Sequence, residues 1–261
     1  MTFEPGTPPS TTAVDDHALA AWLAEEAGRR LLEVRQEGLT GRDLKDAGDL
    51  AAHDLLMALL AEHRPGDIVL SEEGKDDRRR LEADRVWIVD PLDGTREFSE
   101  PPRDDWAVHV ALWERGAADL TAGAVAQPAL GRTFDTGEPP VVPPRTSERP
   151  RIAVSRSRPP EFVHGLGREL DAELVPMGSA GCKVISVVRD VSDAYVHAGG
   201  QYEWDSAAPV AVARAAGLFT SRIDGSPLRY NQDDVYLPDL IVCRPELADA
   251  ILKYVADHGV A

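Results

Sequence analysis

The segment from Trp87 to Phe98 constrains this chain more than any other; it reads Trp-Ile-Val-Asp-Pro-Leu-Asp-Gly-Thr-Arg-Glu-Phe. Val86, Ile88 and Val89 are apolar and β-branched, which predicts a buried strand at its start. Pro91 has no backbone donor and a fixed φ, so we expect the strand to end there in a turn. The segment therefore predicts that polar residues cluster at the end of a buried strand.

The turn that follows the strand carries two carboxylates. Asp90 and Asp93 are separated by two residues, and Gly94 and Thr95 come next. Gly94 can adopt backbone angles that other residues avoid, and Thr95 stands where a helix can begin. Two carboxylates beside backbone donors can hold hard cations and a phosphate group together. On its own, Asp-Gly-Thr would indicate only a polar turn with a capping Asp.

Two further acidic positions favour the cation site. Glu72 follows the apolar run 68–70, and Asp205 precedes the apolar run from 207 to 216. Taken singly, Glu72 would be a solvated loop acid and Asp205 a helix N-cap. Together with Asp90 and Asp93 they form an all-oxygen set without His or Cys, which favours Mg²⁺ or Mn²⁺ over zinc or copper.

The charge of the chain limits its partners. The 261 residues carry a net charge of -17, so we expect binding neither to nucleic acid nor to an anionic membrane. A phosphorylated substrate would be repelled unless metal ions or basic residues offset the charge. No apolar run is long enough to span a membrane and no secretory start is present. Cys182 and Cys243 suggest reduced thiols, and we predict a cytoplasmic protein.

Alternating helices and strands predict a layered α/β architecture. We expect a flexible tail at 1–12, an N-terminal α+β half at 13–140, a Pro-rich linker at 138–150 and a C-terminal α/β half at 151–261. In the first half the pattern predicts a helix from 15 to 34, a loop or mobile hairpin at 38–48 and a second helix that begins at Asp49. A solvated charged loop is expected at 76–85, and strands are expected at 86–90, 106–113 and 119–126. In the second half it predicts strands at 151–155 and 193–197, and helices near 160–171, 205–216 and 245–258.

Three motifs in order resemble the inositol monophosphatase superfamily of magnesium-dependent, lithium-sensitive phosphatases. They lie at Ser71–Glu73, Trp87–Thr95 and Trp204–Ala208, and the resemblance covers roughly residues 15 to 258. It implies a sugar-phosphatase-like α-β-α-β-α fold whose N-terminal sheet is mostly antiparallel. It also implies two or three Mg²⁺ ions, with Mn²⁺ as a substitute and Li⁺ as an inhibitor. The implied metal ligands are Glu72, Asp90, Asp93, Asp205 and the carbonyl of Leu92.

The resemblance also implies roles in phosphate monoester hydrolysis. Thr95 would position a water molecule, and Asp49 would take its proton through the threonine hydroxyl; Glu72 would share in catalysis as a ligand. Backbone N–H groups of Gly94 and Thr95 would hold the phosphoryl oxygens. Asp93 and Asp205 would contact the substrate as well.

Within the superfamily, the chain is most similar to bacterial, and in particular actinobacterial, CysQ-type bisphosphate nucleotidases. Four segments carry this likeness: 95–98, 154–158, 178–183 and 224–230. It implies hydrolysis of 3'-phosphoadenosine 5'-phosphate to AMP in sulfate assimilation. Two departures stand out: Arg158 replaces the family's histidine, and of the family's Thr-x-x-Asp pattern before the second helix only Asp49 matches.

A second phosphate would need its own basic partners. The resemblance implies Lys183 first and Arg158 second, together with Ser157 and Ser179. Lys183 could instead be a surface lysine on a helix, and Arg158 could pair with Glu161.

Other functions stay open. The same metal motifs would serve a phosphatase of inositol phosphates or of fructose 1,6-bisphosphate, and a non-catalytic metal- or nucleotide-sensing module would also retain them. Relatives of this fold occur as dimers and as monomers, so a homodimer is one option.

Overall fold

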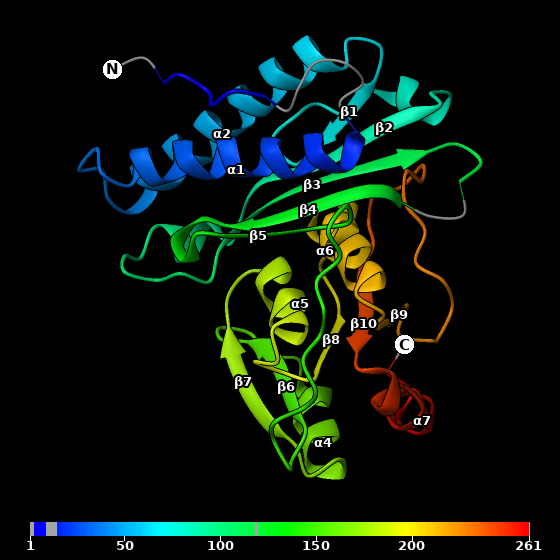
Figure 1. Cartoon of the computed structure of the whole chain (residues 1–261). Coiled ribbons are helices and arrows are strands. Elements are labelled where there is room, and N and C mark those ends of the chain that lie inside the picture. The colour runs from blue at the N-terminus through cyan, green and yellow to red at the C-terminus, as the bar shows by residue number, and fades with distance from the viewer. Residues whose placement is uncertain (1–2, 9–14, 118–119, 261) are drawn as a thin grey trace.

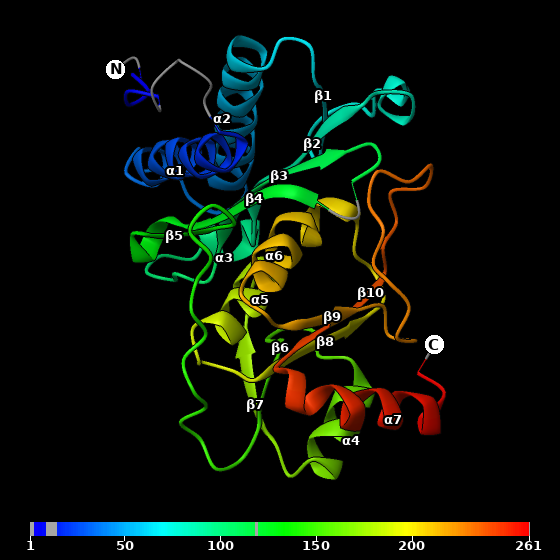
Figure 2. The same cartoon turned by 45° about the vertical axis from the view of Figure 1, so that its right-hand side comes forward.

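The computed structural model describes residues 3–8, 15–117 and 120–260, which form five layers (Figure 1). Helices α1 (Asp16–Val34) and α2 (Gly41–His63) cover one face of the first sheet. Helices α5 (Ala180–Val188) and α6 (Glu203–Ala215) lie between the two sheets, and α4 (Glu161–Glu169) and α7 (Ala248–His258) cover the far side (Figure 2). The predicted α-β-α-β-α layering is confirmed.

The first sheet is mostly antiparallel, as predicted. Its strands follow the order β1-β2-β3-β4-β5, and only β1 and β2 run parallel. Their bounds are Ile68–Ser71, Arg85–Asp93, Ala107–Glu114, Leu120–Gln127 and Arg132–Asp135. A short helix, α3 (Thr95–Phe98), follows β2, and the single-turn helices η1 (Arg78–Leu81) and η2 (Pro128–Leu130) precede β2 and β5.

The second sheet is mixed, with the order β7-β6-β8-β10-β9. Strands β6, β7 and β8 run parallel, whereas β10 is antiparallel to its neighbours β8 and β9. Their bounds are Arg151–Ser155 (β6), Glu173–Met177 (β7), Ala194–Ala198 (β8), Phe219–Ser221 (β9) and Asp239–Cys243 (β10), and η3 (Pro245–Leu247) leads into α7. Parallel strands end at one edge of a sheet, so the chain leaves β6, β7 and β8 on the same side.

Strand β2 is buried on both faces because it is an inner strand between two helical layers. Side chains alternate along a strand, so Trp87 and Val89 pack toward α1 and α2, whereas Val86 and Ile88 pack toward the central helices. This explains why the sequence shows an unbroken apolar run rather than alternation. The strand does not end at Pro91 as predicted: it continues to Asp93 through an irregularity in its pairing with β3.

The predicted loop at 38–48 is wrong, because α2 begins at Gly41 and Asp49 lies well inside the helix. Tertiary packing overrides the low helix propensity of glycine here. Leu44 is buried, and a Cβ on Gly48 would lie 2.6 Å from Phe98 Cε1. Gly48 therefore permits close approach of α2 to α3 instead of breaking the helix.

The charged run at 76–85 is only partly solvated, contrary to expectation. Arg80 in η1 has no exposed surface, and its guanidinium donates to Asp76, to Asn231 Oδ1 at 2.9 Å and to the Gln232 carbonyl at 2.7 Å. A buried arginine needs such partners. Arg80 thus links the N-terminal half of the protein to the loop before β10 through hydrogen bonds.

Other expectations have mixed outcomes. Strand β5 was not predicted from the sequence. The described part of the predicted tail, residues 3–8, contacts α1, because Gly6 N donates to Glu26 at 2.7 Å. The rest of the tail lies outside the described residues. Residue 119, in one of the predicted strands, also lies outside them. Cys182 and Cys243 are buried and free, as expected. Residues 138–150 form neither helix nor strand, and the division into two domains stays a prediction.

None of the helices within the described ranges combines the length and apolar character needed to cross a membrane.

Helix α2 offers a matched pair for testing the core. Leu56 is 0% exposed and Leu50 is 61% exposed. We expect Leu56→Ala to lower the free energy of unfolding by about 2–5 kcal/mol, because it removes buried methyl groups and leaves a cavity. Leu50→Ala should change it by less than about 0.5 kcal/mol. Urea unfolding measures both, and equal effects would contradict the observed packing.

Candidate active site

The predicted acids converge where the first sheet faces α6. Glu72 directly follows β1, whose last residue pairs with Val89 of β2, so Glu72 stands beside Asp90. Asp93 ends β2. Asp205 lies in the first turn of α6, where its carboxylate accepts from Tyr202 N at 2.7 Å. The structure therefore brings all four predicted carboxylates together, although their role as ligands stays a prediction.

The irregular end of β2 shapes this site. Asp90 pairs with His109 and Asp93 with Ala107, so residues 91 and 92 fall outside the ladder. Leu92 N donates to Asp90 Oδ1 at 3.0 Å, which braces the loop. Extra residues of this kind re-aim side chains at a sheet edge, and here they turn both carboxylates toward the central layer.

Gly94 makes the tight exit from this loop possible. Its φ is 87°, a left-handed conformation, and a Cβ there would lie 3.2 Å from the Asp105 carbonyl oxygen. Such a conformation favours glycine. Helix α3 then starts at Thr95, as the sequence predicted.

Thr95 links the loop to α2. Its hydroxyl lies 3.1 Å from the Leu92 carbonyl oxygen and 3.4 Å from Asp49 Oδ1. Burial raises the pKa of Asp49 to about 7, and the nearby charge of Glu73 adds to this effect. A carboxylate with this pKa, within reach of a hydroxyl, is suited to accept a proton near neutral pH.

Asp93 is held by the start of α5. Its carboxylate accepts from the Ser179 hydroxyl at 2.5 Å, from Ala180 N at 3.1 Å and from Gly181 N at 2.6 Å. Burial alone would raise its pKa, but His109, Lys183 and these donors outweigh burial and lower it to about 2. Asp93 is therefore a carboxylate that keeps its negative charge inside the protein.

The other acids lack such compensation. Burial raises the pKa of Asp90 well above its usual range, and the neighbouring charge of Glu72 raises it further. Burial, together with the charge of Asp93, raises the pKa of Glu72 and of Asp205 to about 7. Clustered carboxylates that resist ionisation are stabilised by a bound cation, and oxygen donors of this kind suit Mg²⁺. The donor set thus fits the metal that the sequence predicted.

His109 is a member of this cluster that the sequence-based prediction missed. Ligand atoms of Asp90, Asp93 and His109 all lie within 4.8 Å of one another. The sequence did contain a sign of it, because His109 is a lone polar residue among the apolar residues of β3, a strand expected to be buried. Because register cannot be read from the sequence, its position opposite Asp90 could not be foreseen.

The predicted second-phosphate residues fall into two groups. Lys183 is buried, so it is not a surface lysine; its ammonium donates to the Ser179 carbonyl at 2.5 Å and lies 5.2 Å from the centre of the Tyr195 ring. Burial lowers its pKa. Ser157 and Arg158 are exposed on the turn after β6. Within the described structure Arg158 forms no ion pair with Glu161.

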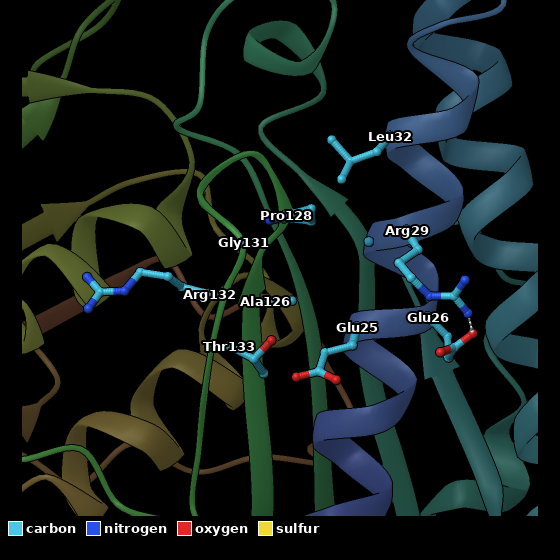
Figure 3. Close-up of a pocket in the computed structure, with 10 residues that line it drawn as sticks. Glu25, Glu26, Arg29, Leu32, Ala126, Pro128, Gly131, Arg132 and Thr133 are labelled. Carbon is cyan, nitrogen blue, oxygen red and sulfur yellow. Dashed lines mark hydrogen bonds and ion pairs between the residues drawn. The ribbon is translucent and has the colours of Figure 1, made fainter. Parts of the chain in front are cut away.

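A separate hollow lies between α1 and strands β4 and β5 (Figure 3). Glu26 and Arg29 on its wall pair with each other, and Arg132 extends away from α1. None of the clustered carboxylates lines it. It is therefore distinct from the acidic site.

The fold and the acidic site define a layered α/β protein with a buried cluster of acidic residues between its sheets. The chain belongs to the inositol monophosphatase family, whose sequence signature matches residues 10–259. This family is metal-dependent, and the acidic cluster agrees with that property.

Three relatives refine this assignment. The chain is 53% identical to a 3'-phosphoadenosine 5'-phosphate phosphatase of Mycobacterium bovis, with 89% of this chain and 90% of the relative covered. It is 30% identical to the 3'(2'),5'-bisphosphate nucleotidase CysQ of Escherichia coli, with 82% and 94% covered. The crystal structure of CysQ from Bacteroides thetaiotaomicron is similar, with a TM-score of 0.73, 27% identity and 88% and 97% coverage.

The raised pKa values predict how Mg²⁺ stabilisation depends on pH. In the metal-free folded state Glu72, Asp205 and Asp49 hold protons up to about pH 7, whereas the unfolded chain releases them near pH 4. Their contribution to stability is therefore lost as the pH rises through about 7. Because a cation competes with these protons, we expect Mg²⁺ to raise the melting temperature more at about pH 8 than at about pH 5.5.

Thermal unfolding with Mg²⁺ and with chelator at both pH values measures this effect. Asp205→Asn, which removes one of these carboxylates, should reduce the Mg²⁺-dependent rise. The same rise at both pH values would show that Glu72 and Asp205 do not bind the cation.

Proposed function

We propose that this protein is a magnesium-dependent phosphomonoesterase that hydrolyses 3'-phosphoadenosine 5'-phosphate to AMP and phosphate. The observation that carries the proposal is the 53% identity, over 89% of the chain, to a mycobacterial phosphatase named for this substrate. The bisphosphate nucleotidase relatives support the same substrate class. A cytoplasmic location, a place in sulfate assimilation and a homodimer stay predictions.

The proposed ligands of Mg²⁺ are Glu72, Asp90, Asp93, Asp205 and the carbonyl of Leu92. When bound there, Mg²⁺ would supply a coordinated water whose pKa is lowered toward neutrality. Mn²⁺ is the proposed substitute and Li⁺ the proposed inhibitor, because both follow from membership of this group of phosphatases.

The protein's own groups would then orient the water and remove its proton. Thr95 lies between the loop of β2 and α2, so its hydroxyl would accept a hydrogen bond from the water while it donates to Asp49 Oδ1. The raised pKa of Asp49 makes it an efficient base near neutral pH. Backbone N–H groups of Gly94 and Thr95 would orient the phosphoryl oxygens.

Lys183 is the proposed partner of the second phosphate. Its ammonium donates to the Ser179 carbonyl and faces the Tyr195 ring, and the charges of Asp93 and Asp205 act on it. A buried cation whose hydrogen-bond acceptor is a neutral carbonyl can gain a stronger, charged hydrogen bond from a phosphate. Ser179 would contribute from the same turn, and Ser157 and Arg158 from the exposed turn after β6.

A phosphatase of inositol phosphates or of fructose 1,6-bisphosphate is the second candidate. It rests on the family assignment, because the whole family would share the acidic site. A non-catalytic sensor is less well supported, since binding alone would not require Asp49 and Thr95 to lie within 3.4 Å of each other.

A comparison of substrates tests the proposal. Phosphate release is measured from 3'-phosphoadenosine 5'-phosphate, inositol 1-phosphate and fructose 1,6-bisphosphate, each with Mg²⁺ and with chelator. We expect a Mg²⁺-dependent preference for the nucleotide. Lys183→Met should lower kcat/KM for the nucleotide by about 10-fold to 100-fold, which corresponds to the loss of one charged hydrogen bond, and affect inositol 1-phosphate less.

Lys253→Met is the matched control, because Lys253 is exposed and pairs with Asp257 on α7. Preference for inositol 1-phosphate would overturn the proposed substrate, and equal losses on both substrates would remove Lys183 from the second phosphate site.

Asp49→Asn tests the proposed base. The variant keeps the shape of the side chain but cannot accept the proton, so we expect kcat to fall by about 10²-fold to 10⁴-fold while Mg²⁺ binding persists. Asp54→Asn, at an exposed position of the same helix, should retain the wild-type rate. Steady-state kinetics with saturating Mg²⁺ compares them, and similar rates for both variants would exclude Asp49 as the base.

A further inference from the structure

His109 contacts two parts of the proposed site from the middle of β3. The side chain has no exposed surface, and its two ring nitrogens face different elements. Nδ1 lies 3.1 Å from the carbonyl oxygen of Trp204, in the first turn of α6, and Nε2 lies 3.2 Å from Asp93 Oδ2. A buried imidazole is costly unless both nitrogens have partners, so this placement calls for a functional explanation.

The contact with Trp204 fixes the orientation of the ring. A carbonyl oxygen only accepts hydrogen bonds, so Nδ1 must carry a hydrogen and donate it. That leaves Nε2 directed at the carboxylate of Asp93. In the described structure Nε2 is close to Asp93 but is not aligned as a hydrogen bond, and it has no other partner. The carboxylate of Asp93 also only accepts hydrogen bonds, so a ring that holds both partners carries a hydrogen on Nε2 as well as on Nδ1. Asp90 lies on the other side of the ring, with its Oδ2 4.0 Å from Nδ1.

Helix α5 closes the third side of the ring. A Cβ placed on Gly181 would lie 2.0 Å from His109 Nε2, so any larger residue at 181 would push the ring away. Gly181 N also donates to Asp93 Oδ2. Strand β3, α5 and the first turn of α6 thus meet at His109, and each contributes to holding Asp93 or Asp205.

We propose that His109 is a positioning residue for Asp93. Its Nδ1–H anchors the ring to the Trp204 carbonyl, and its Nε2 side fixes the orientation in which the Asp93 carboxylate meets the cation. The proposal rests on the metal site of the proposed function. Partners that orient ligating carboxylates affect metal affinity strongly, commonly by 10-fold to 100-fold.

Two amide variants distinguish the contribution of Nδ1 from that of Nε2. The amide nitrogen of Asn reaches the place of Nδ1, so His109→Asn keeps a donor toward Trp204 and loses the group facing Asp93. The amide nitrogen of Gln reaches the place of Nε2, so His109→Gln keeps a donor toward Asp93. We expect calorimetry without substrate to give a Mg²⁺ Kd about 10-fold to 100-fold higher for His109→Asn, and a value close to wild type for His109→Gln.

Gly181→Ala provides a variant with the histidine intact. The added methyl group would displace the ring from Asp93, and we expect it to weaken Mg²⁺ binding by about 10-fold. Gly66→Ala is the control, because a Cβ there meets no atom within 4 Å. Melting temperatures in chelator report whether each variant is folded. If His109→Asn does not fold, Gly181→Ala still tests the proposal.

Two outcomes would overturn the proposal. Wild-type Mg²⁺ affinity in His109→Asn or in Gly181→Ala would mean that His109 only fills the core. Equal weakening in His109→Asn and His109→Gln, with a larger loss for Mn²⁺ than for Mg²⁺, would mean that the imidazole itself ligates the metal. Since no substrate is present, a wrong substrate assignment would leave these results unchanged and would be seen only in the substrate comparison.

Discussion

Mutual repulsion among buried carboxylates is the constraint on which the rest of this structure depends. Asp90 and Asp93 are nearly inaccessible to water, and Glu72 and Asp205 approach them from other elements. Each additional negative charge makes the next harder to ionise. Asp93 receives three donors from the start of α5, whereas Asp90 accepts from Leu92 N and Asp205 from Tyr202 N. That asymmetry divides the cluster into one acid whose pKa is lowered and several whose pKa values are raised.

The layered fold is what allows acids from distant parts of the sequence to meet. Strands β1 and β2 run parallel and so deliver Glu72 and Asp90 to one edge of the first sheet. Helix α6 packs against that sheet and brings Asp205 from the second half. Polar contacts at the periphery hold this arrangement: Arg156 pairs with Glu97 of α3 at 2.6 Å, and Arg80 reaches the loop at 231–232. The two halves of the protein are therefore joined by contacts from two separate segments, the turn after β6 and the loop before β10.

Local chemistry made much of this predictable from sequence, whereas side-chain packing did not. The apolar run before Asp90, the special backbone of Gly94 and the start of a helix at Thr95 were all identifiable from residue types. Asp49 was identified, but not its place within α2, because Gly48 suggested a break and its close packing against Phe98 could not be seen. His109 and Arg80 were missed for a related reason: a buried polar residue is recognised by its partners, and those partners lie far away in sequence.

The position of Asp49 within α2 has a consequence for how the protein tolerates change. The carboxylate is carried by a long helix, and a Cβ on the neighbouring residue, Gly48, would lie 2.6 Å from Phe98 Cε1 and 3.0 Å from Leu92 Cδ2. A bulkier side chain at 48 would shift the helix as a rigid rod and move the carboxylate away from the Thr95 hydroxyl. Under the proposed role of Asp49 as the base, natural variation on that face of α2 would thus be limited by reaction rate and not only by stability.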